Sequence, residues 1–258
     1  METLEESIAV SMDRINHEVI EFLPYILQDF WELGTSADLV AGLIRKHKNN
    51  YQNIHVLDLG SGKGAVSVKL ASELRCRCLG IDGISGFTDY ANQKAKEYHV
   101  DDLCTFETGD IRTKIEPLGQ YDVIVLGATG PIFGNYFDTL SGLSKHLAAD
   151  GLIIIDDGYT DDNGGTSYPW AFHKSELLKQ IHDAGMELAD EIINDDTEDI
   201  EDQYNTELDN INKRCQELVE KYPEKKHIFL EYRDRQKEEY GLLGSEVICS
   251  VMVIKKKQ

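Results

Sequence analysis

A glycine-rich turn is the part of this sequence whose residue types and spacing are best suited to chemistry. It begins with an aspartate and has a glycine at every second position after it, so that its key residues are Asp58, Gly60, Gly62 and Gly64. The pattern predicts an apolar strand before the turn, over 54–59, and an amphipathic helix after it, over 65–74. Because glycine has no Cβ, such a turn brings backbone N–H groups and a helix N-terminus close to a ligand. The stretch therefore predicts a binding site for an anionic or polar group.

Two further acids lie where predicted strands end. Asp82 follows the glycine turn by about twenty residues, a spacing at which an acid can accept hydrogen bonds from ribose hydroxyls. Asp110 follows the next predicted strand. Either acid alone would also fit a helix cap or a turn. Because parallel strands end at the same edge of a sheet, we expect both acids and Asp58 to belong to one site.

The glycine turn alone is compatible with two kinds of ligand. Gly60, Gly62 and Ala65 also fit the dinucleotide pattern G-x-G-x-x-G/A. Asp58 argues against a bound pyrophosphate, because its negative charge precedes the first glycine. An acid at this position suits a ligand that carries an ammonium or a sulfonium.

The elements around the turn predict one α/β domain with additions. From residue 54 onward, strands and helices alternate, which indicates a doubly wound, mostly parallel sheet. Residues 1–48 are predicted to form an N-terminal helical cap, with helical spacing from Ile8 to Phe22, a kink or restart at Pro24, and a further helix capped by Ser36. Two charged helices broken near Pro223 form an insertion over about 195–243. The strands are expected at 54–59, 76–81, 103–107, 121–126, 152–155, 186–193 and 247–254.

Composition restricts the possible partners. The chain has 258 residues and a net charge of −21, and an acidic surface repels nucleic-acid phosphates, so we expect no nucleic-acid partner. The five cysteines lack a second close pair that could complete a zinc site, which favours buried thiols in a reducing compartment. No secretory signal or membrane-length apolar run is present, so we expect a cytoplasmic protein without a membrane partner. The residues give no signal for an oligomeric state.

The motifs resemble those of the class I S-adenosylmethionine-dependent methyltransferases. Residues 56–64 resemble the family's first motif, 80–82 its second and 109–111 its third, while 121–125 and 150–154 resemble its fourth and fifth strands. The resemblance implies S-adenosyl-L-methionine as cofactor and a Rossmann-like, seven-stranded sheet whose last two strands are antiparallel. In the family, the acid of the second motif holds the ribose and that of the third meets the adenine amine. The cofactor-binding residues implied here are Asp58, Gly60, Ser61, Gly62, Gly64, Asp82, Gly83, Asp110, Ile111 and Gly127.

The end of the fourth strand departs from two branches of that family. Residues 126–131 do not have the Asn/Asp-Pro-Pro-Tyr/Phe sequence of the enzymes that methylate amino groups in nucleic acids. Gly127 and Ala128 also lack the Asp that metal-dependent catechol-type members carry there. Asp156 and Asp157 could donate oxygen ligands to a metal, but we interpret them as solvated loop acids and expect no metal.

The substrate pocket is expected between the cap and the region after the fifth strand, so residues 1–48 and 158–240 would form the chamber. The candidate lining aromatics are Tyr25, Phe30, Trp31, Tyr159, Tyr168 and Trp170, although such rings could instead pack the cap onto the sheet. His173 is a candidate general base that could equally be a helix cap. We expect methyl transfer to a small-molecule acceptor. The alternatives are a protein-directed methyltransferase, a non-catalytic S-adenosylmethionine-binding protein and an NAD-dependent oxidoreductase.

Overall fold

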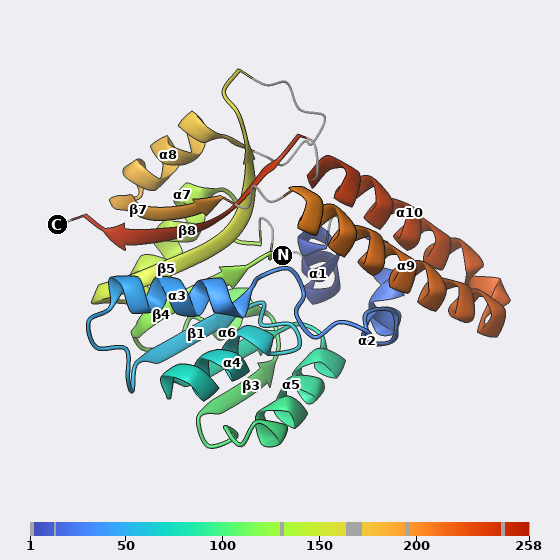
Figure 1. The fold of residues 1–258 in the computed structure, drawn as a ribbon, viewed down its shortest axis with the longest axis horizontal. Helices are drawn as coiled ribbons and strands as arrows, with labels where there is room; N and C mark the ends of the chain where they lie inside the picture. Colours follow the sequence, from blue (N-terminus) through green and yellow to red (C-terminus); the bar gives the residue numbers. More distant parts are fainter. Residues whose placement is uncertain are drawn as a thin grey trace.

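The protein is built on one mixed sheet with helices on both faces (Figure 1). The computed structural model describes residues 3–12, 14–129, 132–163, 172–193, 197–243 and 246–257. Seven strands follow the order β3-β2-β1-β4-β5-β8-β7, and the short β6 pairs with β5 outside this order. The strands are β1 (His55–Leu59), β2 (Arg77–Asp82), β3 (Cys104–Thr108), β4 (Tyr121–Gly127), β5 (Leu147–Thr160), β6 (Phe172–His173), β7 (Met186–Ile193) and β8 (Ile248–Lys256).

The strand directions confirm the predicted doubly wound, mostly parallel sheet. β1 pairs in parallel with β2 and β4, and β4 pairs in parallel with β5. β8 runs antiparallel to both neighbours, β5 and β7. The last two strands therefore form the expected antiparallel pair, and the helix between β5 and β7 leaves β8 as the strand that runs against both of its neighbours.

Apolar side chains alternate along the central strands and divide the core into two layers. Val56, Val123 and Ile154 pack against α3 (Ala37–His47), α4 (Ala65–Leu74) and α5 (Ser85–Glu97). Leu57, Ile124 and Ile153 pack on the opposite side against α6 (Ile111–Lys114), α7 (Tyr136–Leu143) and α8 (Lys174–Asp183). A sheet covered on both faces exposes its carboxyl-end edge, where a ligand can bind.

The first predicted helix is interrupted. The structure has α1 (Leu4–Ser11), the 3-10 helix η1 (His17–Phe22) and α2 (Leu23–Ile26) in place of one helix from Ile8 to Phe22. The chain leaves the helical conformation at Arg14, whose φ is +58°, and the Asn16 side chain caps η1 by accepting the Glu18 N–H. Local capping therefore outweighs the apolar periodicity.

The fifth strand is longer than the predicted 152–155. β5 extends to Thr160 because β8 pairs with it from Ile153 to Tyr159. Asp156 and Asp157 consequently lie in the sheet, and their interpretation as loop acids was wrong. Backbone pairing with a strand almost a hundred residues away holds them at the carboxyl-end edge.

The insertion packs against the N-terminal cap at one end of the sheet (Figure 1). It consists of α9 (Thr197–Lys221), the short η3 (Pro223–Lys225) and α10 (Lys226–Leu243), so the predicted break near Pro223 is present. Leu23 and Ile26 of the cap belong to one apolar cluster with Phe229 of the insertion. The Arg214 guanidinium binds both carboxylate oxygens of Asp29, at 2.6 and 2.8 Å. Cap and insertion thus form one layer.

Lys63 of the glycine turn attaches this layer to the sheet. Its side chain is 3% exposed, and Nζ donates hydrogen bonds to the carbonyl oxygens of Leu27 and Phe30. In return, the Trp31 indole N–H donates to the Lys63 carbonyl oxygen at 3.1 Å. The position of the cap is therefore coupled to that of the turn.

Replacing Gly64 should destabilise the protein, whereas the same change at Gly42 should not. Gly64 has a φ of +74°, and a Cβ there would lie 2.6 Å from the Ala91 Cβ and 2.7 Å from the Phe106 ring. We expect Gly64→Ala to lower the free energy of unfolding by about 1–3 kcal/mol through overpacking. Gly42 lies exposed in α3 with open space around it, so Gly42→Ala should raise that free energy by about 0.5–1 kcal/mol. Urea unfolding measures both, and equal effects would contradict the packing assigned to Gly64.

The buried Lys63 should make stability depend on pH in the alkaline range. Burial lowers its pKa from 10.5 to about 8, so between these values the unfolded chain binds more protons than the folded one. The contribution of Lys63 to the free energy of unfolding therefore increases from pH 8 towards 10.5. In urea unfolding, wild type should gain stability over Lys63→Met across this range. Lys237→Met, at an exposed site, is the control. If the difference in the free energy of unfolding between wild type and Lys63→Met stays constant with pH, the lowered pKa of Lys63 is ruled out.

Candidate functional site

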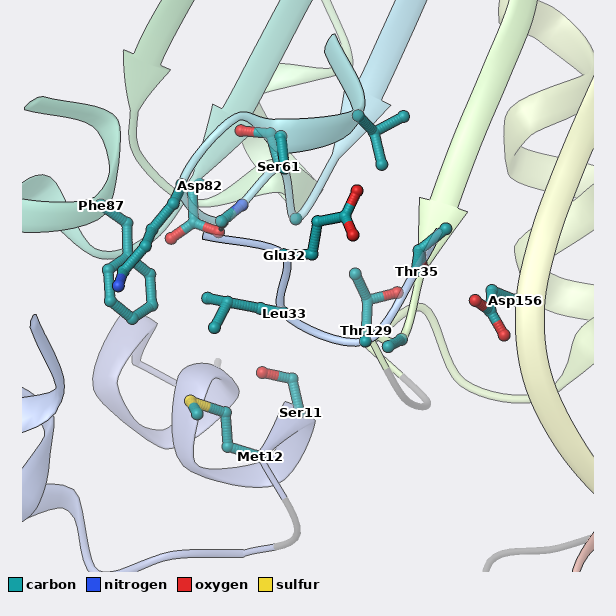
Figure 2. A pocket seen from close by; sticks show the side chains of 18 of the residues that line it. Ser11, Met12, Glu32, Leu33, Thr35, Ser61, Asp82, Phe87, Thr129 and Asp156 are labelled. Atoms are coloured by element: carbon teal, nitrogen blue, oxygen red, sulfur yellow. Dashed lines mark hydrogen bonds between the residues drawn. The ribbon is translucent and has the colours of Figure 1, made fainter. Parts of the chain in front are cut away.

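A cavity of about 600 Å³ lies between the carboxyl-end edge of the sheet and the layer of cap and insertion. Its walls come from α1, the segment 27–36, the glycine turn, the ends of β2, β4 and β5, and the helices α9 and α10. Figure 2 shows Ser61 and Asp82 on one side of it and Thr35, Thr129 and Asp156 on the other. The cavity therefore extends from a first region at the glycine turn to a second region towards the insertion.

The glycine turn lines the first region with backbone. Gly60 and Gly62 have φ values of +73° and +51°, and a Cβ on Gly60 would lie 2.1 Å from the Thr129 Cγ2. The Ser61 hydroxyl is buried and has no hydrogen-bond partner within the part of the chain that the structure describes. Such a polar atom at a cavity wall is a candidate to bind a ligand.

The Asp82 carboxylate connects the turn to the next strand. One oxygen accepts the Gly62 N–H and the other the Ile84 N–H, both at 2.8 Å. Burial is the main cause that raises its pKa to about 6, against the effect of these two hydrogen bonds. Because each carboxylate oxygen has a second lone pair, Asp82 can still accept hydrogen bonds from a ligand in the cavity.

Asp58 and Asp110 lie on either side of Asp82. Asp58 is buried below the turn, where it accepts the Ser67 hydroxyl at 2.7 Å, and burial raises its pKa to about 6. Asp110 caps α6 and binds the Arg112 side chain, which lowers its pKa. All three acids line the cavity, so the expected grouping at one edge is present and the capping role of Asp110 accompanies it.

Most of the other residues predicted to bind the cofactor also line the cavity. Ser61, Gly83, Ile111 and Gly127 do so. Gly64 does not, because it begins α4 and packs against Ala91 and Phe106. Its glycine is required by packing and by its positive φ, so its prediction as a cofactor contact is corrected.

The predicted substrate residues separate into two groups. Phe30 and Trp31 line the cavity. Tyr25 does not: it is 41% exposed and its hydroxyl donates to Glu217 at 2.6 Å. Tyr159 is also absent from the wall, since it is buried among the α7 and α8 residues and accepts a hydrogen bond from Lys174. Tyr168 and Trp170 lie outside the described residues.

His173 lies outside the cavity, at the start of α8, where its side chain makes no capping hydrogen bond. It occupies the N-cap position of α8, and its Nδ1 lies 3.1 Å from both the Thr160 hydroxyl and the Asp161 carbonyl oxygen. It does not line the cavity.

The second region contains residues that sequence reasoning did not select. They are Asp156 of β5, Tyr204 and Glu207 of α9, Glu239 and Tyr240 of α10, and Cys249 of β8. Burial raises the pKa of Asp156 to about 6. The expectation that residues 158–240 contribute to the chamber was the only sequence signal for this group. The individual residues could not be chosen, because the spacing of apolar residues in the insertion helices does not show which helix face meets the sheet.

The described residues contain no group of three His, Cys, Asp or Glu side chains that could hold a metal ion. None of their helices is long and apolar enough to cross a membrane.

Comparison with known proteins identifies the family. A family model described as a methyltransferase domain matches residues 50–231. S-adenosylmethionine-dependent methyltransferases from Geobacter sulfurreducens and Thiobacillus denitrificans, both solved with S-adenosyl-L-homocysteine, superpose with a TM-score of 0.74 at 20% and 17% identity. Each alignment covers 92% of this chain and 98% of the other. The release factor glutamine methyltransferase of Buchnera aphidicola is 34% identical over 95 residues, or 32% of this chain and 34% of that relative. Because the model covers more than half of the chain, including the glycine turn, Asp82 and Asp110, the protein belongs to the class I S-adenosylmethionine-dependent methyltransferases.

Proposed function

We propose that the enzyme transfers the methyl group of S-adenosylmethionine to a small-molecule acceptor held in the second region of the cavity. The observation that carries this proposal is the continuity of one cavity from the glycine turn to the insertion helices, beneath the cap. A small acceptor could lie there beside the cofactor. The cap and the insertion cover this space, which favours a small molecule over a folded macromolecule.

The residues at the glycine turn fit S-adenosylmethionine. The Ser61 hydroxyl and the Asp82 and Asp110 carboxylates line the cavity and are available for hydrogen bonds to a nucleoside. We assign Asp82 to the ribose hydroxyls and Asp110 to the adenine amine. Asp58 puts negative charge below the turn, which suits the cationic amino-acid part. When bound, the cofactor supplies an electrophilic methyl group on a sulfonium.

The chain's own contribution to such a transfer is alignment and exclusion of water. Methyl transfer is an in-line displacement whose rate depends on how the two reactants are held. Leu4 and Ile8 of α1 and Met12, which follows that helix, line the cavity, and so do Phe30 and Trp31. Lys63 holds the Leu27–Phe30 segment on the glycine turn, so the same contact that shapes the cofactor region positions the apolar cover.

A protein-directed methyltransferase is the second candidate. The similarity to a release factor glutamine methyltransferase favours it, although the match spans only about a third of that relative. The long charged helices α9 and α10 would then be the docking surface. We place this candidate second because those helices close the cavity with their inner faces.

Removing the Asp82 charge should weaken cofactor binding. Asp82→Asn replaces one acceptor oxygen by an N–H₂ group that opposes the Gly62 or Ile84 N–H. Losing charge-assisted hydrogen bonds of about 1.5–3 kcal/mol should raise the Kd of S-adenosylhomocysteine about 10- to 100-fold in calorimetry. Asp101→Asn, on the exposed surface, should leave the Kd unchanged. A wild-type protein that does not bind S-adenosylhomocysteine would refute the proposed site.

The size class of the acceptor can be tested directly. The enzyme is incubated with methyl-labelled S-adenosylmethionine and a cell extract that ultrafiltration has divided into metabolites and macromolecules. We expect enzyme-dependent label in the metabolite fraction, because the cap and insertion enclose the second region. Label confined to proteins in the macromolecular fraction would replace the proposal by the protein-directed candidate. Heat-inactivated enzyme is the control.

A further inference from the structure

The second region of the cavity has a composition that restricts the chemistry of the acceptor. We call it the acceptor lobe and define it by Asp156, Tyr204, Glu207, Glu239, Tyr240 and Cys249. Its walls combine carboxylates with aromatic rings. Lys63 is the only Lys or Arg among the described residues that line the cavity, and it lies at the opposite end with its ammonium turned to the Leu27 and Phe30 carbonyls.

Ring stacking and hydrogen bonds hold four of the acceptor-lobe side chains, Tyr204, Glu207, Glu239 and Tyr240, in place. The Tyr204 and Tyr240 rings stack with centroids 4.8 Å apart and an interplanar angle of 12°. The Tyr240 hydroxyl donates to one oxygen of Glu207 at 2.7 Å, and the Gln236 amide donates to one oxygen of Glu239 at 2.7 Å. The lobe is therefore organised before a ligand binds, which reduces the entropy cost of binding.

Two neutral side chains of the lobe have pKa values raised by burial and by nearby negative charge. Burial, together with the neighbouring carboxylates Asp156 and Asp157, raises the pKa of Cys249 to about 11. The pKa of Tyr204 rises to about 12 for similar reasons, with Glu207 among the contributing charges. The negative charge that keeps the Cys249 thiol and the Tyr204 hydroxyl protonated also opposes an anionic ligand and favours a cation.

A buried hydroxyl at the edge of the lobe provides independent support for a ligand. Thr35 lines the cavity and is 4% exposed, and its Oγ1 makes no hydrogen bond to any described residue. It is a hydrogen-bonding neighbour of the Asp156 carboxyl and lowers that group's pKa, against the larger effect of burial, although the two side chains do not form a hydrogen bond of normal geometry. Figure 2 shows Thr35 between Thr129 and Asp156 at the cavity wall. A hydroxyl left without a partner inside a polar cavity is suited to accept a hydrogen bond from a bound donor.

We propose that the acceptor is a small molecule with a basic amino group, and that the acceptor lobe binds this group as an ammonium. An ammonium offers three N–H donors and a positive charge, which match the Asp156 and Glu207 carboxylates and the Thr35 hydroxyl. The stacked Tyr204 and Tyr240 rings add cation–π attraction. Phosphorylated or carboxylate acceptors are disfavoured by the same charges. This inference rests on the proposed function, because it assigns the lobe to the methyl acceptor.

The test compares matched probes on the protein saturated with S-adenosylhomocysteine. The probes are butylamine, phenethylamine and tyramine, each with its N-acetyl derivative and with the carboxylate of equal length. Calorimetry should show the amines binding at least tenfold more tightly than their neutral partners, and the carboxylates not binding. Amines that bind no better than the neutral partners, or that do not bind at all, would overturn the inference while leaving the proposed function intact. Failure of S-adenosylhomocysteine itself to bind would instead overturn the proposed function.

Variants locate the effect within the lobe. Glu207→Gln and, separately, Asp156→Asn should raise the Kd of the amines about tenfold and leave the Kd of S-adenosylhomocysteine unchanged. Glu220→Gln removes a charge from the exposed part of the same helix and should change neither value. Two separate lobe variants are used so that a folding defect in one of them does not decide the test, and circular dichroism checks that both variants are folded. Equal amine affinity in wild type and both lobe variants would contradict the assignment.

Discussion

The bridge that the Asp82 carboxylate makes between two backbone N–H groups is the contact on which the site depends most. It joins the glycine turn after β1 to the first residues beyond β2, so the ends of two neighbouring strands hold one another. The parallel pairing of Leu59 with Ile81 brings these ends together before any ligand is present. A buried carboxylate is costly unless it is hydrogen-bonded, which explains why both oxygens are used. The cofactor region is therefore a property of the sheet's edge and not of a loose loop.

A second set of contacts joins this edge to the layer that covers it. Lys63 extends from the turn to the cap, and Arg214 extends from the insertion to Asp29 of the cap. The cap is thus held by polar contacts from two directions, in addition to the apolar cluster that it shares with the insertion. The Lys63 ammonium is buried, and hydrogen bonds to two carbonyl oxygens take the place of its water ligands. This contact between the turn and the cap is therefore polar, and its geometry is specific. Binding at the glycine turn and closure of the cavity are expected to influence each other through it.

The parts of the site that could be predicted from the sequence are those set by local geometry. A strand, a glycine turn and a helix form a unit within about twenty residues, so Asp58, Gly60, Gly62 and Asp82 could be placed without knowledge of the tertiary structure. Asp156 could not, because its position depends on the pairing of β5 with β8. Tyr25 was misplaced because it lies on α2, a helix of one turn. The direction of a side chain on such a short helix depends on how the helix packs against its neighbours and not on its own sequence. His173 and Gly64 show that a residue type suited to chemistry is also suited to local hydrogen bonding and to close packing.

The Arg214–Asp29 contact also has a consequence for how the molecule assembles. Its residues are 185 positions apart in the sequence, whereas the Gly62–Asp82 contact spans 20 positions. Closing a longer loop costs more chain entropy, and contacts of long range form slowly. On a ribosome, the turn and its partners are complete long before the insertion and β8 have been made. We therefore expect the nascent chain to build its nucleoside-binding edge early and to enclose the acceptor space last, so that a truncated or newly made chain could hold the cofactor before it could hold anything to methylate.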